Sequence, residues 1–219
     1  MSRTAFIFDM DGTIVDNMKF HELSWKEFFA RRGMEIDNES FFRATAGRLG
    51  SEIMRDYFGA SLSDDDCAAF SREKEEIYRE LYEPHRKLAE GLEAFLGEAL
   101  QAGISLAVAT AAPRENVEFI LDGLDIRRRF KTVVGARDVR RGKPHPDVFL
   151  QAAQGCGAEP RQCVVFEDAP LGVEAAARAG MPAVVLTTTD GRDGFGSFNN
   201  VIALGRDFSC FNLRELIAH

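Results

Sequence analysis

Polar side chains that could do chemistry follow directly after apolar runs at four places in this sequence of 219 residues. The run FIF at residues 6–8 leads into Asp9 and Asp11, two carboxylates with one residue between them, and then into Gly12. The other places supply a hydroxyl, an ammonium group and two more carboxylates, which belong to Thr110, Lys143, Glu167 and Asp168. One carboxylate after an apolar run is an ordinary strand end, but the same arrangement at four places predicts a shared site.

Carboxylates that gather at one point stay ionised only where a cation holds them. Aspartate oxygens are hard ligands that suit Mg²⁺, an ion that usually keeps water ligands and is shared with a substrate phosphate. Thr110, Lys143 and the free backbone N–H groups after the first run are typical partners of phosphate. Gly12 lets the backbone turn tightly beside such an anion. The set of residues therefore predicts phosphoryl transfer assisted by Mg²⁺.

Alternating strands and helices are expected to position these groups. Short apolar runs with strand character cover residues 4–8, 104–110, 131–136, 162–168 and 182–188. Helical patterns cover residues 91–103, 113–126, 145–157, 170–180 and 211–219. Such alternation predicts an α/β fold, a Rossmann-like parallel sheet with helices on both faces. Ligands of such sheets bind at the carboxyl ends of the strands, where the polar residues fall.

The segment between the first strand and Pro84 has a different pattern. Apolar residues recur there at helical spacing, without a convincing strand. Four helices are expected, over residues 18–33, 37–47, 51–59 and 63–83. We therefore predict a core domain made of residues 1–15 and 85–219, and an inserted, all-helical cap domain made of residues 16–84.

Composition excludes several classes of function. The 27 Lys and Arg residues against 35 Asp and Glu residues give a net charge of −8, which disfavours nonspecific binding to nucleic acid. The four cysteines form no C-x-x-C pair, so neither a zinc site nor a disulfide framework is indicated. No apolar run reaches the roughly 20 residues that span a bilayer, and no basic and apolar leader precedes the first strand. We expect a cytoplasmic protein with free thiols.

The motifs, in their order along the chain, resemble those of a known superfamily. The stretch Asp9-Met10-Asp11-Gly12-Thr13, then Thr110, Lys143 within GKPHPD, and Glu167-Asp168 are similar to the four motifs of the haloacid dehalogenase superfamily. The helical insertion after the first motif and the stretch FEDAPLGVEAAARAGMP resemble its β-phosphoglucomutase-like branch. The resemblance extends over nearly the whole chain.

The resemblance implies roles for the four acidic residues. Asp9 matches the nucleophile that forms an aspartyl-phosphate. Asp11 matches the general acid and base, which protonates the leaving oxygen and then activates water. Asp9, Asp168 and the backbone carbonyl of Asp11 match the Mg²⁺ ligands, and Glu167 matches a carboxylate that supports them. Asp11 also argues against haloacid dehalogenases and phosphonatases, which lack an aspartate at that position.

The resemblance also implies residues that bind the substrate. In the core these are the phosphate-binding residues Thr110, Ala111 and Lys143. In the cap, three residues match positions that can face the part of the substrate that is not transferred, namely His21, Arg48 and Lys74. A structural histidine and two solvated helix charges are the alternative interpretation of the cap residues.

Three functions remain open. The first is a Mg²⁺-dependent phosphatase for a small phosphorylated metabolite such as a sugar phosphate, because a closing cap excludes water and large substrates. The second is a β-phosphoglucomutase. Such mutases tend to carry an arginine three residues after the cap glycine, whereas here Arg48 follows Gly47 at once and Gly50 stands at that position. The third is a receiver domain that is phosphorylated on aspartate without turnover. We expect no nucleic-acid or membrane partner and a monomer or weak homodimer.

Overall fold

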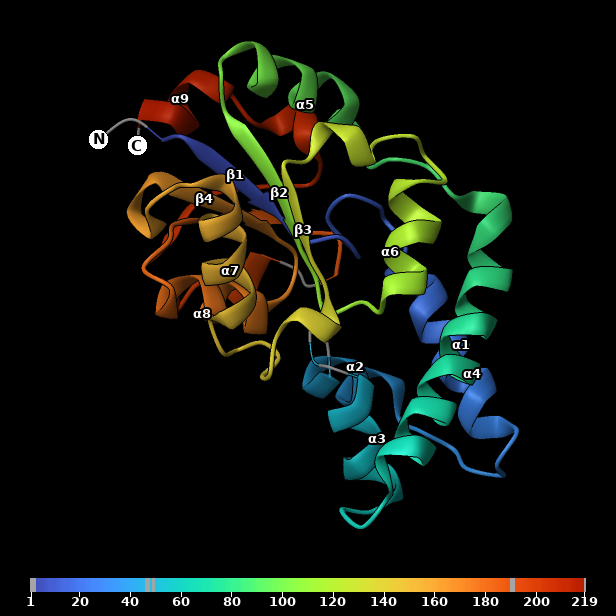
Figure 1. Cartoon of the computed structure of the whole chain (residues 1–219). Coiled ribbons are helices and arrows are strands. Elements are labelled where there is room, and N and C mark those ends of the chain that lie inside the picture. Colours follow the sequence, from blue (N-terminus) through green and yellow to red (C-terminus); the bar gives the residue numbers. More distant parts are fainter. Residues whose placement is uncertain (1–2, 46–47, 49, 190–191, 219) are drawn as a thin grey trace.

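The computed structural model describes residues 3–45, 48, 50–189 and 192–218, with the side chains of 38, 39, 42, 43, 192 and 193 excepted. Its sheet has six strands in the order β3-β2-β1-β4-β5-β6, and every neighbouring pair is parallel. The strands are β1 (Ala5–Phe8), β2 (Ser105–Ala109), β3 (Thr132–Val134), β4 (Cys163–Glu167), β5 (Ala183–Leu186) and β6 (Val201–Gly205). The predicted α/β class is confirmed (Figure 1).

Both faces of the sheet are covered because side chains alternate across each strand. Phe6 and Phe8 of β1 pack on one face, in a core that includes residues of α5 (Leu92–Gln101), α6 (Arg114–Leu121) and α9 (Leu213–Ala218). Ala5 and Ile7 pack on the other face, against α7 (Asp147–Cys156) and α8 (Pro170–Arg178). All four residues of β1 are buried, as an apolar run without alternation predicts.

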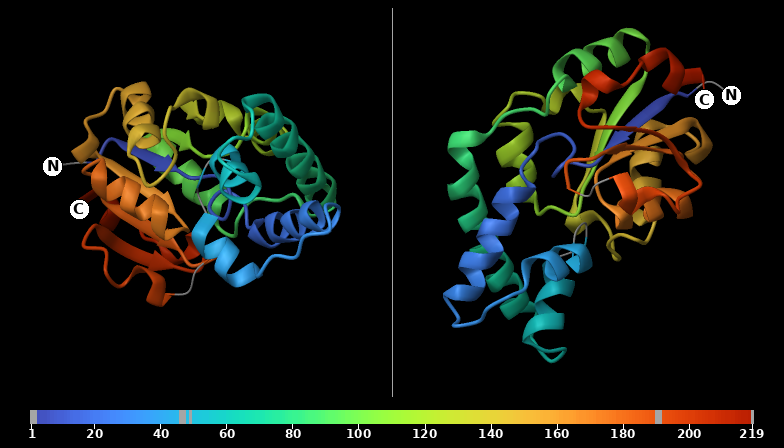
Figure 2. Two further views of the ribbon diagram at one scale, coloured as in Figure 1. Left: turned by 90° about the horizontal axis from the view of Figure 1, so that it is seen from below. Right: turned by 180° about the vertical axis from the view of Figure 1, so that it is seen from behind.

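The segment after β1 forms four helices, which we call the helical block: α1 (Met18–Ala30), α2 (Asn38–Thr45), α3 (Gly50–Phe58) and α4 (Asp64–Tyr82). The block has its own aromatic core, in which Trp25, Phe28, Phe29 and Phe41 pack together. Figures 1 and 2 show the block beside the sheet, beyond the carboxyl ends of β1 and β2. The domain boundaries at residues 16 and 84 stay a prediction.

One strand escaped the sequence analysis. β6 lies at the edge of the sheet, and its pairing with β5 is irregular between Ala183 and Val184. Four of its five residues are only partly buried, although residues 201–204 form a run of four apolar residues, which is a short strand signal. Ala203 and Gly205 are also weak strand formers. The predicted strand over residues 131–136 is shorter than expected, with Thr132–Val134 in the sheet.

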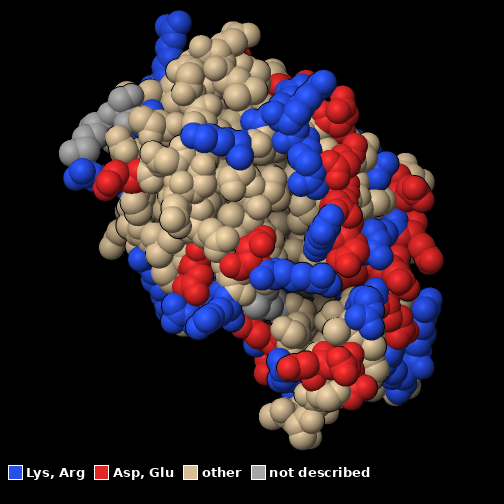
Figure 3. Space-filling view, in the orientation of Figure 1, with Lys and Arg blue, Asp and Glu red and all other residues tan. Residues whose placement is uncertain are grey.

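The surface carries charges of both signs over the helical block and along the side where α4 and α6 lie (Figure 3). The part of the view over the sheet and α7 is mostly uncharged (Figure 3). Among the residues that the structure describes, no helix combines the length and the apolar character needed to cross a membrane.

Candidate active site

The predicted site residues of the α/β part meet at one edge of the sheet. β1 lies between β2 and β4, with Phe8 opposite both Val108 and Phe166. The next residue on each strand therefore reaches the same level, and the N–H of Asp9 donates to the carbonyl of Phe166 at 2.9 Å. Residues that lie about 100 and 160 positions apart in the sequence become neighbours because parallel strands end together.

Lys143 joins two of the carboxylates. Its Nζ donates to Asp9 Oδ1 at 2.7 Å and also to Glu167 Oε1. Lys143 is 3% exposed, so its charge is shielded from solvent and held by these two partners. The second oxygen of Asp9 accepts no hydrogen bond from any described residue. One oxygen of Asp9 is thus fixed and the other is available to react.

Three carboxylates could hold a metal ion. One oxygen each of Asp9, Glu167 and Asp168 lie within 4.8 Å of one another, and all three residues are buried. Glu167 Oε2 accepts from the N–H groups of Asp168 (2.9 Å) and Ala169 (3.0 Å), so both of its oxygens already have partners. This donor set fits a hard divalent cation.

The position of Asp168 depends on its neighbours. Its Oδ1 accepts from Thr13 Oγ1 at 3.2 Å and its Oδ2 accepts from Thr189 Oγ1. Gly12 has a φ of +74°, and a Cβ there would lie 2.1 Å from Asp168 Oδ2. Only glycine therefore combines this turn with this close approach of the carboxylate. The hydroxyl of Thr13 thus helps to position Asp168.

Crowding changes the acid–base behaviour of the cluster. Burial raises the pKa of Asp9 to about 7, and Glu167 and Asp11 add to the effect while Lys143 opposes it. Burial and the charges of Glu167 and Asp9 raise the pKa of Asp168 well above its ordinary value. Burial alone would lower the pKa of Lys143, but the two carboxylates raise it instead. More negative charge is gathered here than one ammonium can balance, which is what a cation site requires.

Asp11 has a different environment. Burial would raise its pKa, but the nearby His21 and a hydrogen bond from Asn17 lower it overall. Asn17 Nδ2 donates to Asp11 Oδ1 at 2.6 Å, and His21 Nε2 lies 3.3 Å from the same oxygen. Asp9 and Asp11 thus have different environments, because Asp9 is bonded to Lys143 and Asp11 faces the helical block.

Asn17 is a site residue that the sequence analysis missed. Its Oδ1 accepts from the N–H of Gly12 at 3.0 Å and its Nδ2 also contacts the hydroxyl of Tyr78 at 2.5 Å. The amide thereby links the first loop, Asp11 and α4. Its side chain is fully buried. The available signal was an asparagine placed between the first motif and the start of a helix, which reads as a helix cap.

The predicted cap residues His21 and Lys74 are close to the site but are already paired. Lys74 Nζ lies 2.8 Å from His21 Nδ1 and donates to Glu75 Oε1 at 3.0 Å. Lys74 is 2% exposed, and the His21 ring stacks on Tyr78 with 3.8 Å between centroids. Because Lys74 holds a hydrogen bond to Nδ1, the other ring nitrogen of His21 is the one that faces Asp11.

Arg48 and the loop after β2 complete the predicted set. Arg48 Nη2 pairs with Asp56 Oδ2 at 2.8 Å, and its Nε lies 3.8 Å from Glu52. Gly47, on which the comparison with mutases depends, lies outside the described residues. Thr110 Oγ1 accepts from the N–H of Ala112 at 3.0 Å, which leaves the hydroxyl hydrogen free for an anion.

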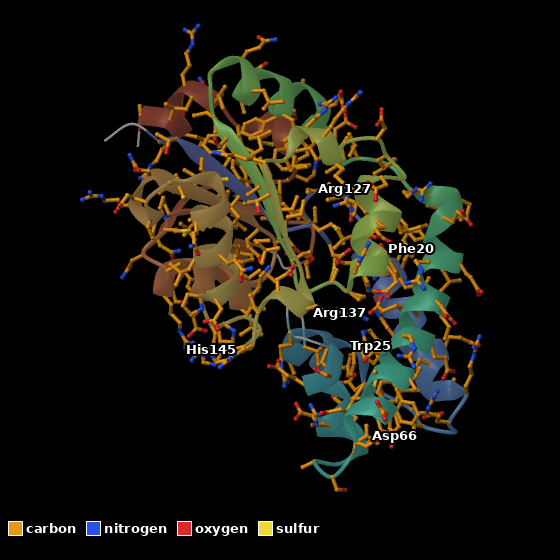
Figure 4. The ribbon with its side chains drawn as sticks, viewed as in Figure 1. Phe20, Trp25, Asp66, Arg127, Arg137 and His145 are labelled. Atoms are coloured by element: carbon orange, nitrogen blue, oxygen red, sulfur yellow. The ribbon has the colours of Figure 1, made fainter. Side chains whose placement is uncertain are left out.

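A cavity of about 500 Å³ lies between the strand ends and the helical block. Every predicted site residue except Lys143 lines it, and Lys143 is buried behind Asp9 and Glu167. Figure 4 shows Arg137 at the edge of the α/β part that faces the block, and Trp25 within the block. Both residues line the cavity. The arrangement can therefore enclose a small molecule whose anionic end points at Asp9.

Comparisons with known proteins agree with this geometry. The family model described as haloacid dehalogenase-like hydrolase matches residues 6–186. A fructose-1-phosphate phosphatase of Escherichia coli strain K12 is 37% identical over 184 residues, which are 82% of this chain and 94% of the relative. A validoxylamine A 7'-phosphate phosphatase of Streptomyces hygroscopicus subsp. limoneus is 34% identical over 84% of this chain and 85% of its own.

A solved structure of similar fold is a β-phosphoglucomutase from Clostridium difficile, with a TM-score of 0.84 and 25% identity, covering 98% of this chain and 95% of its own. The match spans both the α/β part and the helical block. A receiver domain is therefore not the correct interpretation of the aspartate, threonine and lysine at the strand ends. The resemblance seen in the motifs is confirmed, and the chain belongs to the haloacid dehalogenase-like hydrolases.

Proposed function

We propose that this enzyme hydrolyses a small phosphorylated metabolite, a sugar or polyol phosphate, with Mg²⁺ and through an aspartyl-phosphate on Asp9. The observation that carries the proposal is the state of Asp9 at the base of the cavity. Lys143 holds one of its oxygens, the other accepts no hydrogen bond from a described residue, and Asp11 stands two residues away in a separate environment. A fixed nucleophile beside an independent acid and base is what two-step phosphoryl transfer needs.

The two steps balance with these residues. In the first, the free oxygen of Asp9 bonds to phosphorus while the bond to the leaving oxygen breaks, and Asp11 gives that oxygen a proton. In the second, Asp11 takes a proton from water, which attacks phosphorus and releases Asp9. Thr110, Ala111 and Lys143 hold the phosphoryl oxygens in place.

The role of the metal in the proposed reaction is electrostatic. Asp9, Asp168 and the carbonyl of Asp11 would hold Mg²⁺, which would supply positive charge against the phosphoryl oxygens. Glu167 holds Lys143 and the N–H groups of Asp168 and Ala169, so it fixes the ligands rather than the substrate.

Hydrolysis is favoured over transfer to a second hydroxyl. A mutase must also bind a second phosphate, which calls for free cations in the cap. Of the cap cations named above, Lys74 is already bonded to Glu75 and His21, and Arg48 is paired with Asp56. Arg72 of α4 also lines the cavity and forms no ion pair with a described residue, so it is the cap cation that a second phosphate would use. The relatives named as phosphatases of sugar-type phosphates point the same way. The β-phosphoglucomutase of similar fold keeps transfer as the second candidate.

A screen of hexose and hexitol phosphates with Mg²⁺, measuring released phosphate, tests the proposal. We expect turnover on at least one of them and none in Asp9→Asn, since the amide is a poor nucleophile. A parallel reaction with glucose 1-phosphate and glucose 1,6-bisphosphate follows the formation of glucose 6-phosphate. Isomerisation that outpaces phosphate release would reverse the order of the two candidates.

We further propose a cytoplasmic enzyme that is a monomer or a weak homodimer.

A further inference from the structure

Asn116 of α6 is a fully buried amide that two residues of the helical block hold. Its Nδ2 donates to Glu75 Oε2 at 2.6 Å, and its Oδ1 accepts from Arg79 Nη1 at 2.7 Å. Glu75 and Arg79 lie one turn apart on α4, so they approach the same amide from one helix face. We call these three residues the clasp. Because both partners carry charge, each hydrogen bond is stronger than one between neutral groups.

A second contact between α4 and α6 is apolar. It lies near the point where the chain passes from α4 back to the α/β part. The Phe119 ring of α6 packs against Tyr78 and Tyr82, with centroids 6.2 and 6.4 Å apart. Arg86, just beyond the end of α4, donates from Nη1 to the carbonyl of Phe119 at 2.8 Å. Tyr82 is the last residue of α4, after which the chain returns to the α/β part. This contact therefore sits where the helical block is attached.

The clasp extends the contact between α4 and α6 away from the attachment. Arg79 lies between Tyr78 and Tyr82, but Glu75 is seven positions before Tyr82, about 10 Å along a helix. All three clasp residues also line the cavity, whereas Phe119 does not. A rotation of the block about its attachment would displace the hydrogen bond between Glu75 and Asn116 more than the contact at Tyr82. Figure 1 shows α4 and α6 side by side on the flank of the molecule.

The clasp is also connected to Asp11. Glu75 Oε1 accepts from Lys74 Nζ at 3.0 Å, Lys74 Nζ lies 2.8 Å from His21 Nδ1, and His21 Nε2 lies 3.3 Å from Asp11 Oδ1. Each of these side chains is buried or nearly so. Glu75 thus has one oxygen in the clasp and the other in the chain that reaches the acid and base of the reaction.

The α/β end of the clasp is linked to the phosphate site. α6 begins at Arg114, directly after the loop in which Ala112 donates to Thr110 Oγ1. Asn116 is therefore carried on the helix that follows the phosphate-binding residues. The amide of Asn116 connects α6, which follows the phosphate-binding residues, with α4, which carries the Glu75 and Lys74 of the chain to Asp11.

We propose that Asn116 is a positioning residue that latches the helical block over the bound substrate and, through Glu75, Lys74 and His21, holds Asp11 in place. Its role in turnover rests on the phosphatase reaction proposed above, but the latch itself is a property of the folded protein. Asn116 touches neither the phosphate nor the reacting oxygens. It raises the fraction of enzyme molecules in which the helical block is closed and Asp11 is correctly oriented.

Asn116→Asp tests the latch, because it sets a carboxylate against Glu75 while changing the side-chain volume little. We expect amide hydrogen exchange in α4 and α6 to rise about tenfold or more, since a hydrogen bond to a charged group is lost. Exchange in β1 and β4 should stay unchanged. In the phosphatase assay, kcat/KM should fall by a similar factor, with KM raised because fewer molecules are closed.

Glu75→Gln on top of Asn116→Asp should restore the contacts. The amide introduced by Glu75→Gln can donate to the new carboxylate, its oxygen can accept from Lys74, and Arg79 still donates. Each single variant loses a contact and the double variant regains it, a pattern that general destabilisation does not give. Arg79→Met removes one of the two hydrogen bonds and serves if Asn116→Asp fails to fold. Glu118→Gln is the matched control, because Glu118 pairs with Arg114 on the exposed side of α6.

Exchange in Asn116→Asp equal to that of the unchanged protein, or a double variant no better than the worse single variant, would overturn the latch. The exchange experiment needs no substrate. If no phosphorylated metabolite is turned over but the exchange pattern appears, the latch holds and the proposed function falls. If turnover is seen without the exchange pattern or the rescue, the proposed function holds and the latch falls.

Discussion

Lys143 is the residue on which the charge balance of the site depends. It lies between Asp9 and Glu167, 3% exposed, and its pKa is raised by both. Two carboxylates at this distance from one another would not both stay ionised without it. The lysine thus fixes one oxygen of Asp9 and opposes the rise in the pKa of Asp9 that burial causes.

Lys143→Met should therefore damage both stability and turnover. Removing one partner of a buried ion pair costs about 3–5 kcal/mol, because the remaining charges are left without compensation. We expect urea unfolding at pH 7 to show a loss of this size and phosphate release to fall at least about a hundredfold. Lys131→Met is the matched control, since the one hydrogen bond of Lys131 to a described residue goes to the carbonyl of Cys156, which does not belong to the site. Equal losses in the two variants would contradict this account.

Asn17 controls Asp11 in a way that pH can reveal. Its hydrogen bond helps to lower the pKa of Asp11. In the proposed reaction kcat/KM covers the step in which Asp11 is the acid. An acid works only below its pKa, so loss of the donor should move the basic limb of the kcat/KM profile to higher pH. We expect this shift in Asn17→Ala. Asn212→Ala, which removes a surface hydrogen bond to Glu215, should leave the profile in place. A profile of unchanged position in Asn17→Ala would remove this asparagine from the acid–base machinery.

At the scale of elements, close approach decides where glycine is required. Gly172 lies in α8, and a Cβ there would meet Glu167 Oε1 at 1.9 Å. The first turn of α8 thus comes against the carboxylate that supports Lys143. Gly97 lies inside α5 with nothing within 4 Å of its Cβ position. Both positions are glycines within helices, but a side chain would be crowded at Gly172 and would have open space at Gly97.

Alanine at these two glycines should change stability in opposite directions. Gly97→Ala is expected to raise the free energy of unfolding by about 0.5–1 kcal/mol, the helix propensity difference. Gly172→Ala should lower it, by roughly 1–3 kcal/mol for an overpacked site, because Glu167 must move. Thermal melts of both variants, with far-UV circular dichroism to check the fold, give the comparison. Stabilisation by both substitutions would show that Glu167 has room to shift.

The sequence was sufficient to predict the central strands, but not the edge strand or the asparagines that link one element to another. β1, β2 and β4 are apolar runs that end in polar residues, so both the strands themselves and the meeting of those polar residues at one edge of a parallel sheet could be predicted. β6 is harder to predict, because an apolar run of four residues that contains alanine and ends in glycine is a weak strand signal. Asn17 and Asn116 gave no signal of the hydrogen bonds that they make. Each acts through partners that are distant in sequence, and a lone asparagine beside a helix start reads as a cap or turn.

For the whole molecule, the cavity shared by the α/β part and the helical block concentrates negative charge at one end. Three buried carboxylates meet there in a chain whose net charge is already −8. Burial raises the pKa of Asp9 from 3.8 to about 7. Such a carboxyl binds its proton more tightly in the folded state. It therefore stabilises the fold at pH below about 4, and this contribution is lost as the pH rises through 7.

Mg²⁺ should stabilise the protein more at pH 8 than at pH 5.5, because protons compete with the metal for Asp9 and Asp168. At a free concentration of about 100 times the dissociation constant, binding adds about 2.7 kcal/mol, or roughly 5–10 °C in Tm for a chain of this size. Melts after chelation, with and without added Mg²⁺, measure the difference at each pH. Asp168→Asn should remove most of the shift, whereas Asp207→Asn, a carboxylate bonded to Ser209 far along the chain, should keep it. A shift that does not depend on pH, or one that survives in Asp168→Asn, would mean that Mg²⁺ binds elsewhere than at these strand ends.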